Sequence, residues 1–109
     1  MQVAVIHTAF EDTPRTVAFV DVPEEISAFG TTNECLEYAY RWTNNVMGSW
    51  SRKEKTFEDG MENGDYNDAV TVMAPLNEDG MGLRSTSMGD QMLIGTTKYK
   101  VAMCGFEAI

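Results

Sequence analysis

His7 is the only histidine in the 109-residue chain, so any imidazole-based chemistry must use this side chain. A serine nucleophile, a histidine base and an orienting carboxylate could be drawn from Ser85 or Ser87, His7 and Asp90. The chain contains no Gly-x-Ser-x-Gly turn that would present such a serine. We therefore expect His7 to be an ordinary histidine of a strand, and we predict that the protein is not an enzyme.

The two cysteines, Cys35 and Cys104, lack the Cys-x-x-Cys spacing of zinc ribbons and thioredoxin-type sites. Both stand among apolar residues and lie far apart in the sequence. We predict that both are buried thiols, which pack as small hydrophobic residues in a reducing compartment. A single long-range disulfide is the less favoured alternative.

Three side chains with oxygen atoms alternate along the chain as at the start of a calcium-binding loop: Asn63, Asp65 and Asn67. In an EF-hand, a glycine would follow at the position of Asp68 and a glutamate would stand in place of Ala74. The sequence therefore excludes an EF-hand and predicts no cofactor. A weak divalent-cation site within residues 58–68 stays open as an alternative.

The formal net charge of −9 comes from 17 acidic and 8 basic residues. Such a charge repels DNA, RNA and anionic membranes, because clustered Lys and Arg are needed to bind phosphate groups. It favours encounter with a basic protein instead. No apolar stretch is long enough to span a bilayer. We therefore expect a basic protein as partner, and no direct contact with nucleic acid or membrane.

Most of the negative charge lies between residues 57 and 90, where Arg84 is the only basic residue. Within this stretch, we predict that the partner is bound by an aromatic residue and seven acids: Glu58, Asp59, Glu62, Asp65, Tyr66, Asp68, Glu78 and Asp79. Residues 52–68, which we call the acidic loop, are polar and long for a loop in a compact domain. The alternative is a solvated loop whose aromatic side chains fold back on the core.

The elements around this loop predict a single α+β domain over residues 1–109, with the order ββαβββ. Alternating β-branched residues predict strands over 2–10 and 16–22, joined as a hairpin by residues 11–15. A third strand is expected over 69–74, and a second hairpin over 91–104 that turns at 95–97. We therefore expect a mostly antiparallel sheet of about five strands, covered by one amphipathic helix.

The helix begins at a capping box formed by Thr31 and Glu34. Helical spacing then aligns apolar residues on a single stripe as far as position 50: Cys35, Ala39, Trp42, Val46 and Trp50. This pattern predicts one helix that continues close to Gly48 and buries the stripe against the sheet.

Residues 84–106 resemble the C-terminal end of YodL-like domains, which are carried by phages, plasmids and conjugative elements. The positions that carry the resemblance are Ser85, Ser87, Asp90, Tyr99, Val101, Gly105 and Phe106. Residues 36–51 are also similar to phage proteins. The resemblance implies a mobile-element origin, and a polar bend followed by a hairpin that ends in a glycine and an aromatic residue. It implies no catalytic activity.

We therefore expect a viral accessory protein in the host cytoplasm, which binds and inhibits a host protein of the kind that anti-CRISPR or anti-restriction proteins target. One alternative is a binder of a small molecule or nucleotide signal, held by residues after the acidic loop: Arg84, Ser85, Thr86 and Ser87. Another is a minor virion or assembly component. A homodimer is left open.

Overall fold

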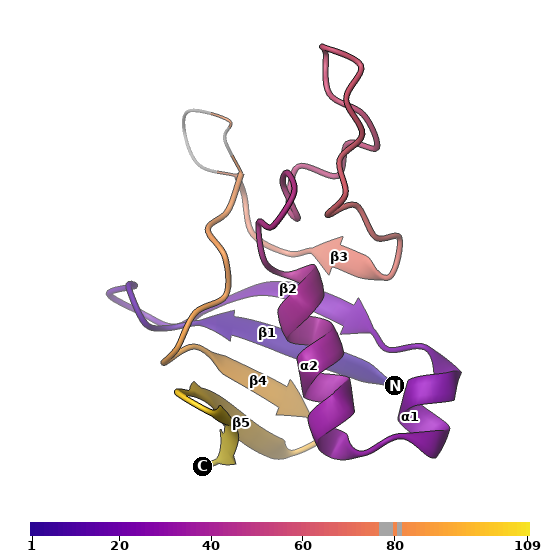
Figure 1. The fold of residues 1–109 in the computed structure, drawn as a ribbon. Helices are drawn as coiled ribbons and strands as arrows, with labels where there is room; N and C mark the ends of the chain where they lie inside the picture. The colour runs from indigo at the N-terminus through magenta and orange to yellow at the C-terminus, as the bar shows by residue number, and fades with distance from the viewer. Residues whose placement is uncertain (77–79, 81) are drawn as a thin grey trace.

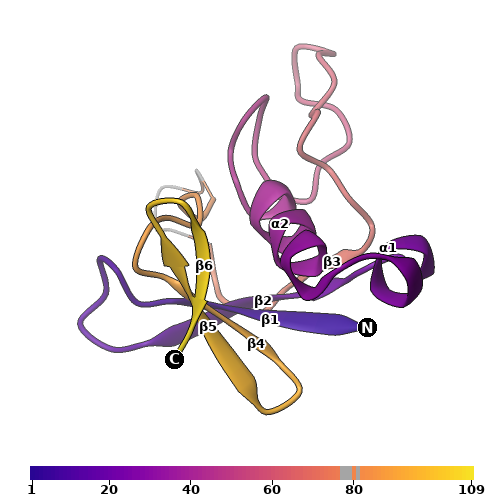
Figure 2. The ribbon, with the colours of Figure 1, turned by 60° about the horizontal axis from the view of Figure 1, so that its bottom comes forward.

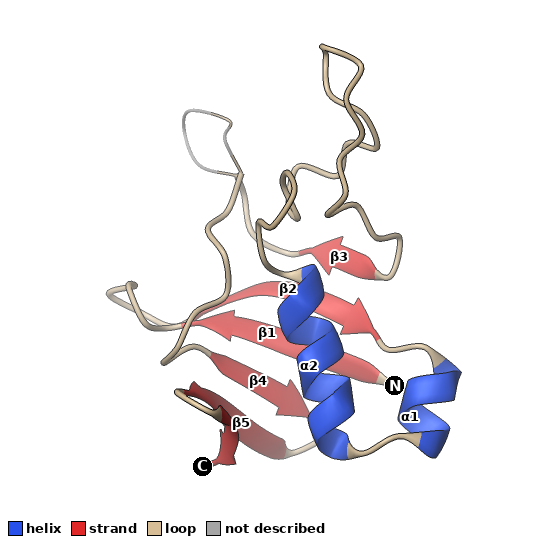
Figure 3. Ribbon diagram, in the orientation of Figure 1, coloured by secondary structure: helices blue, strands red, loops and turns tan. Residues whose placement is uncertain are grey.

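The computed structural model describes residues 1–76, residue 80 and residues 82–109. The elements within these residues are β1 (Gln2–His7), β2 (Arg15–Asp21), α1 (Glu24–Phe29), α2 (Thr32–Trp42), β3 (Val70–Val72), β4 (Gln91–Ile94), β5 (Thr97–Ala102) and β6 (Gly105–Ala108). The strands form one antiparallel sheet in the order β3-β2-β1-β4-β5-β6 (Figures 1 to 3; β6 is labelled in Figure 2). The predicted α+β class is confirmed, and the structure adds α1 and β6 to the expected elements.

Both helices lie on the same face of the sheet (Figure 2). Cys35, Leu36 and Ala39 of α2 are buried, and so are Val3 and Val5 of the central strand β1. Burial of these apolar side chains between helix and sheet supplies the main favourable term in folding. The core therefore forms where the sequence predicts it, between the amphipathic helix and the sheet.

The helix start is confirmed, because the Thr31 hydroxyl accepts a hydrogen bond from the Glu34 N–H at 3.1 Å. The predicted continuation beyond Trp42 is wrong. The Thr43 hydroxyl donates to the Ala39 carbonyl at 2.8 Å, and the Asn44 amide donates to the Tyr40 carbonyl. These bonds satisfy carbonyls of the last turn. Residues 43–48, which we call the exit turn, then leave the helix.

The first hairpin also differs from its predicted bounds, because β1 ends at His7 and not at residue 10. The Asp90 carboxylate accepts hydrogen bonds from the N–H groups of Thr8 and Ala9, at 2.8 and 2.9 Å. These donors are thereby taken out of the strand ladder. The connection to β2 is residues 8–14.

The C-terminal part contains one strand more than the sequence indicated. The predicted hairpin of β4 and β5 is confirmed, with Ile94 opposite Thr97. The chain then turns at Met103 and Cys104, and Gly105 begins β6 with a φ of 112°, which a glycine accommodates without strain. Cys104 is exposed in this turn, so the prediction of a buried thiol is correct for Cys35 and wrong for Cys104.

Candidate functional site

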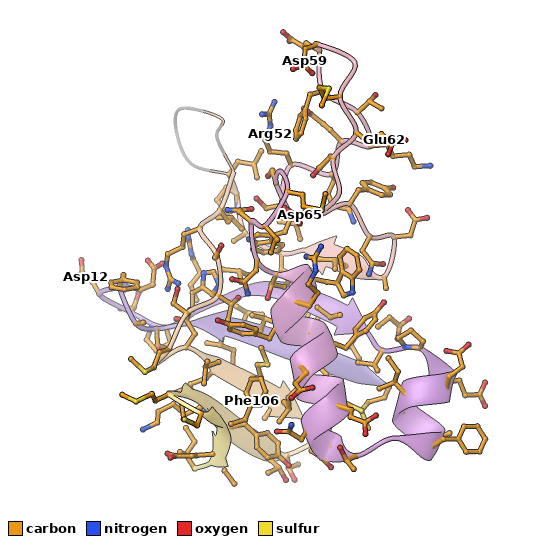
Figure 4. All side chains as sticks on the ribbon, in the orientation of Figure 1. Asp12, Arg52, Asp59, Glu62, Asp65 and Phe106 are labelled. Atoms are coloured by element: carbon orange, nitrogen blue, oxygen red, sulfur yellow. The ribbon has the colours of Figure 1, made fainter. Side chains whose placement is uncertain are left out.

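The acidic loop extends away from the sheet beyond the C-terminal end of α2 (Figures 1 and 4). Its outer part is a small hairpin, in which Thr56 bridges to Glu62 and the Phe57 N–H donates to the Met61 carbonyl at 2.9 Å. Glu58 and Asp59 lie exposed at the turn of this hairpin. The structure therefore presents acidic groups at the end of a projecting segment.

Four of the predicted partner-binding acids are exposed in the acidic loop: Glu58, Asp59, Glu62 and Asp68. Asp59 lies at the outer end of the loop, and Glu62 lies on its side (Figure 4). Two further predicted acids, Glu78 and Asp79, lie outside the described residues. The exposed acids are those that can face a partner.

Asp65 is a correction to the predicted set, because it is fully buried at the base of the acidic loop. One carboxylate oxygen accepts hydrogen bonds from the N–H groups of Val46, Met47 and Gly48, at 2.7 to 2.9 Å. The other oxygen accepts from the Arg41 guanidinium at 3.1 Å. Asp65 therefore fastens the acidic loop to the exit turn and to α2, and its carboxylate is not exposed on the surface.

Asn63 fastens the same loop to the chain that leads into it. Its side-chain oxygen accepts from the Ser49 N–H at 3.0 Å, and its amide nitrogen donates to the carbonyls of Ser49 and Glu54, both at 2.8 Å. Asn67 accepts from the Ala69 N–H and donates to the Tyr38 hydroxyl. The calcium-like spacing therefore serves backbone capping, and no metal-holding group of three or more His, Cys, Asp or Glu occurs in the part of the chain that the structure describes.

Tyr66 is half-buried and is engaged within the loop. The ammonium groups of Lys53 and Lys55 lie 4.7 and 5.5 Å from the centre of its ring. Its hydroxyl donates to Asp68, and this hydrogen bond raises the pKa of Tyr66. Burial lowers the pKa of Lys53. The ring of Tyr66 is thus stacked against the loop's own cations, which orders the base of the acidic loop.

The four residues predicted to bind a small ligand are used inside the protein. Thr86 is buried, and its N–H donates to the Thr43 carbonyl at 2.9 Å. The Ser85 hydroxyl accepts from the Asn45 N–H, and the Ser87 hydroxyl donates to the Ser85 carbonyl. Arg84 donates to both oxygens of Asp90, at 2.7 and 2.9 Å. The structure therefore gives this segment an internal role, which is to join the exit turn to the sheet.

His7 lies in a buried cluster with Thr86 and Asp90, whereas the serines considered for a catalytic triad are not its partners. His7 Nε2 is 2.9 Å from the Thr86 hydroxyl and 3.9 Å from the Asp90 carboxylate. The Thr86 hydroxyl gives its single proton to Thr43, so His7 Nε2 must be the donor to Thr86. All three side chains are buried, so the cluster does not face solvent.

Burial sets the charge of this cluster. It lowers the pKa of His7 to about 4, against an opposing effect of the Asp90 carboxylate. Burial alone would raise the pKa of Asp90, but the bonds from Arg84 and from the N–H groups of Ala9, Ser87 and Thr8 outweigh it and lower that pKa to about 2. Near neutral pH the cluster thus holds a neutral imidazole beside an Arg84–Asp90 ion pair.

The chain was compared with protein-family models, curated proteins and solved structures. No protein-family model, no curated protein and no solved structure matches the chain. Within the described residues, no helix is long and apolar enough to cross a membrane.

Sequence reasoning missed the exit turn as part of the site, because it placed Val46 on the buried stripe of a longer helix. Val46 and Met47 are exposed in the structure. The signal that could have shown this is the succession Thr43-Asn44-Asn45, whose side chains compete with the helix for its own carbonyls.

Proposed function

We propose that this protein binds a basic surface of a host protein through the exposed acids of the acidic loop, and that binding inhibits the host protein. The observation that carries the proposal is the projecting loop itself, which holds Glu58, Asp59 and Glu62 in solvent. Its base is fastened by the buried Asp65 and Asn63. Charges held in place in this way steer a partner of opposite charge and fix its orientation.

Enzymes that process nucleic acid are the partner class that best fits this chemistry. Their substrate grooves are lined with Lys and Arg, which bind phosphate groups. A chain of net charge −9 is attracted to such a groove and competes there with the nucleic acid. The resemblance of residues 84–106 to domains of phages and conjugative elements supports a defence enzyme as the target, as for anti-CRISPR and anti-restriction proteins.

The test compares two variants with the same change in charge. The loop variant carries Glu58→Lys, Asp59→Lys and Glu62→Lys. The control variant carries Asp12→Lys, Glu24→Lys and Glu25→Lys, which are exposed acids outside the acidic loop. Each protein is immobilised on a resin and incubated with a bacterial lysate, with and without added heparin. The bound proteins are then quantified by mass spectrometry.

We expect the wild type and the control variant to retain a basic protein that heparin displaces. The loop variant should retain at least about tenfold less of this basic protein, because attraction at the loop has become repulsion. Equal retention by both variants would show that only the overall charge matters, and would overturn the assignment to the acidic loop.

A further inference from the structure

Three large apolar side chains of the exit turn and the acidic loop are exposed to solvent. Val46, Met47 and Met61 are 64 %, 70 % and 66 % exposed, respectively. Single exposed apolar residues are common, but a group of them rimmed by charged residues marks an interaction surface. Two of these side chains belong to the exit turn and one belongs to the acidic loop, so their proximity depends on how those two segments meet.

The exit turn and the acidic loop are packed against each other. A Cβ on Gly64 would lie 2.9 Å from the Met47 sulfur, so the Met47 side chain lies directly against the backbone of the acidic loop. A Cβ on Gly48 would lie 2.9 Å from the ring of Phe57, in the hairpin that also contains Met61. These close approaches place the apolar side chains of both segments on one end of the molecule, with Glu58, Asp59 and Glu62.

The backbone of residues 46–48 in the exit turn is bound inward, and the side chains of Val46 and Met47 are exposed. The N–H groups of Val46, Met47 and Gly48 all donate to the buried Asp65 carboxylate, whose second oxygen is held by Arg41. Three successive residues are thereby fixed before any partner arrives. A surface ordered in advance loses less conformational entropy on binding, so more of its contact energy appears as affinity.

From this arrangement we infer that Val46, Met47 and Met61 are the apolar anchors of the proposed binding surface. They enter a nonpolar recess of the partner, while Glu58, Asp59 and Glu62 contact lysines and arginines at the rim of that recess. Methionine suits this role because its unbranched side chain adapts to an irregular pocket. The inference rests on the proposed function and specifies its partner: a basic protein surface with an apolar recess.

The experiment uses two synthetic helical peptides as probes. One carries leucines on one face and lysines on the other, and in the second peptide every leucine is replaced by serine. Their affinities for the wild type are measured by titration calorimetry. The same is done for the anchor variant Val46→Ser/Met47→Ser, for Met61→Ser and for the charge-reversed loop variant. The matched control is Met88→Ser/Met103→Ser, since those side chains are 58 % and 84 % exposed and line another groove.

We expect the wild type and the matched control to prefer the leucine peptide over the serine peptide. In the anchor variant, the ratio of the affinities for the leucine and serine peptides should fall about tenfold. In Met61→Ser this ratio should fall by a smaller factor. Unchanged melting temperatures show that the variants fold. A preference that persists undiminished in the anchor variant and in Met61→Ser overturns the inference but does not contradict the proposed role of the acids. If the wild type and the loop variant bind each peptide with the same affinity, the proposed function is overturned as well.

Discussion

At the scale of single residues, His7 ties the stability of the protein to pH. Its pKa is about 4 in the folded protein and 6.5 in an unfolded chain. The unfolded state therefore binds more protons between these two values, and the free energy of unfolding falls as the pH falls through this window. The full stabilisation is present above pH 6.5, and the loss down to about pH 4 amounts to about 3 kcal/mol. Urea denaturation at a series of pH values measures it.

His7→Gln is the variant that isolates this effect, because glutamine keeps a donor for the Thr86 hydroxyl but does not titrate. The chain has no other histidine, so the decline between pH 6.5 and 4.5 should flatten in the variant. Asp90 acts in a lower window: its pKa of about 2 lies below the usual 3.8, so its contribution disappears only as the pH falls through those values. A decline that is equally steep in His7→Gln would contradict the assignment to His7.

At the scale of elements, Asp65 decides how the exit turn and the acidic loop are joined. Replacing it with alanine leaves three backbone N–H groups without their carboxylate and removes the partner of Arg41. We expect Asp65→Ala to lower the free energy of unfolding by about 2–4 kcal/mol. The amides of residues 46–48 should exchange faster with deuterium. Thermal denaturation and hydrogen exchange give the two readouts.

Glu62→Ala is the control for that prediction, because Glu62 is an exposed acid of the same loop. A surface substitution of this kind changes the stability by about 0.5 kcal/mol or less. If Asp65→Ala and Glu62→Ala shift the unfolding transition equally, the buried carboxylate does not hold the exit turn.

The helix shows what a sequence can predict at this scale and what it cannot. The start of α2 depends on Thr31 and Glu34, which are three residues apart, so the capping box was sufficient to locate it. The end depends in part on distant residues, since Thr43 is held by Thr86 and the turn beyond it by Asp65. The periodicity of apolar residues contains no information on these long-range bonds. It therefore predicts that Val46 is buried, whereas Val46 is exposed.

The candidate site divides in the same way. Residue type and spacing found the acidic loop and its exposed carboxylates, because the excess of acids between residues 57 and 90 is a property of the sequence alone. They could not separate Asp65 from Glu62, since both are acids in the same polar stretch. Only the fold shows that one carboxylate is buried against three N–H groups while the other faces solvent.

At the scale of the whole molecule, the net charge of −9 opposes folding, because the compact state brings like charges together. Salt screens this repulsion: the Debye length falls from about 30 Å at 0.01 M to about 8 Å at 0.15 M ionic strength. We expect the free energy of unfolding of the wild type to rise by about 1 kcal/mol over this range. Denaturation in urea at both ionic strengths measures the change.

The loop variant then separates binding from folding. Each of its three reversals shifts the net charge by two, so repulsion within the free protein decreases and its stability at low salt should match or exceed that of the wild type. Its affinity for a basic partner should decrease at the same time. If the stability of the loop variant rises while its affinity for a basic partner falls, Glu58, Asp59 and Glu62 contribute to partner binding at a cost in stability. A loop variant that loses stability together with binding would instead make these acids part of the fold.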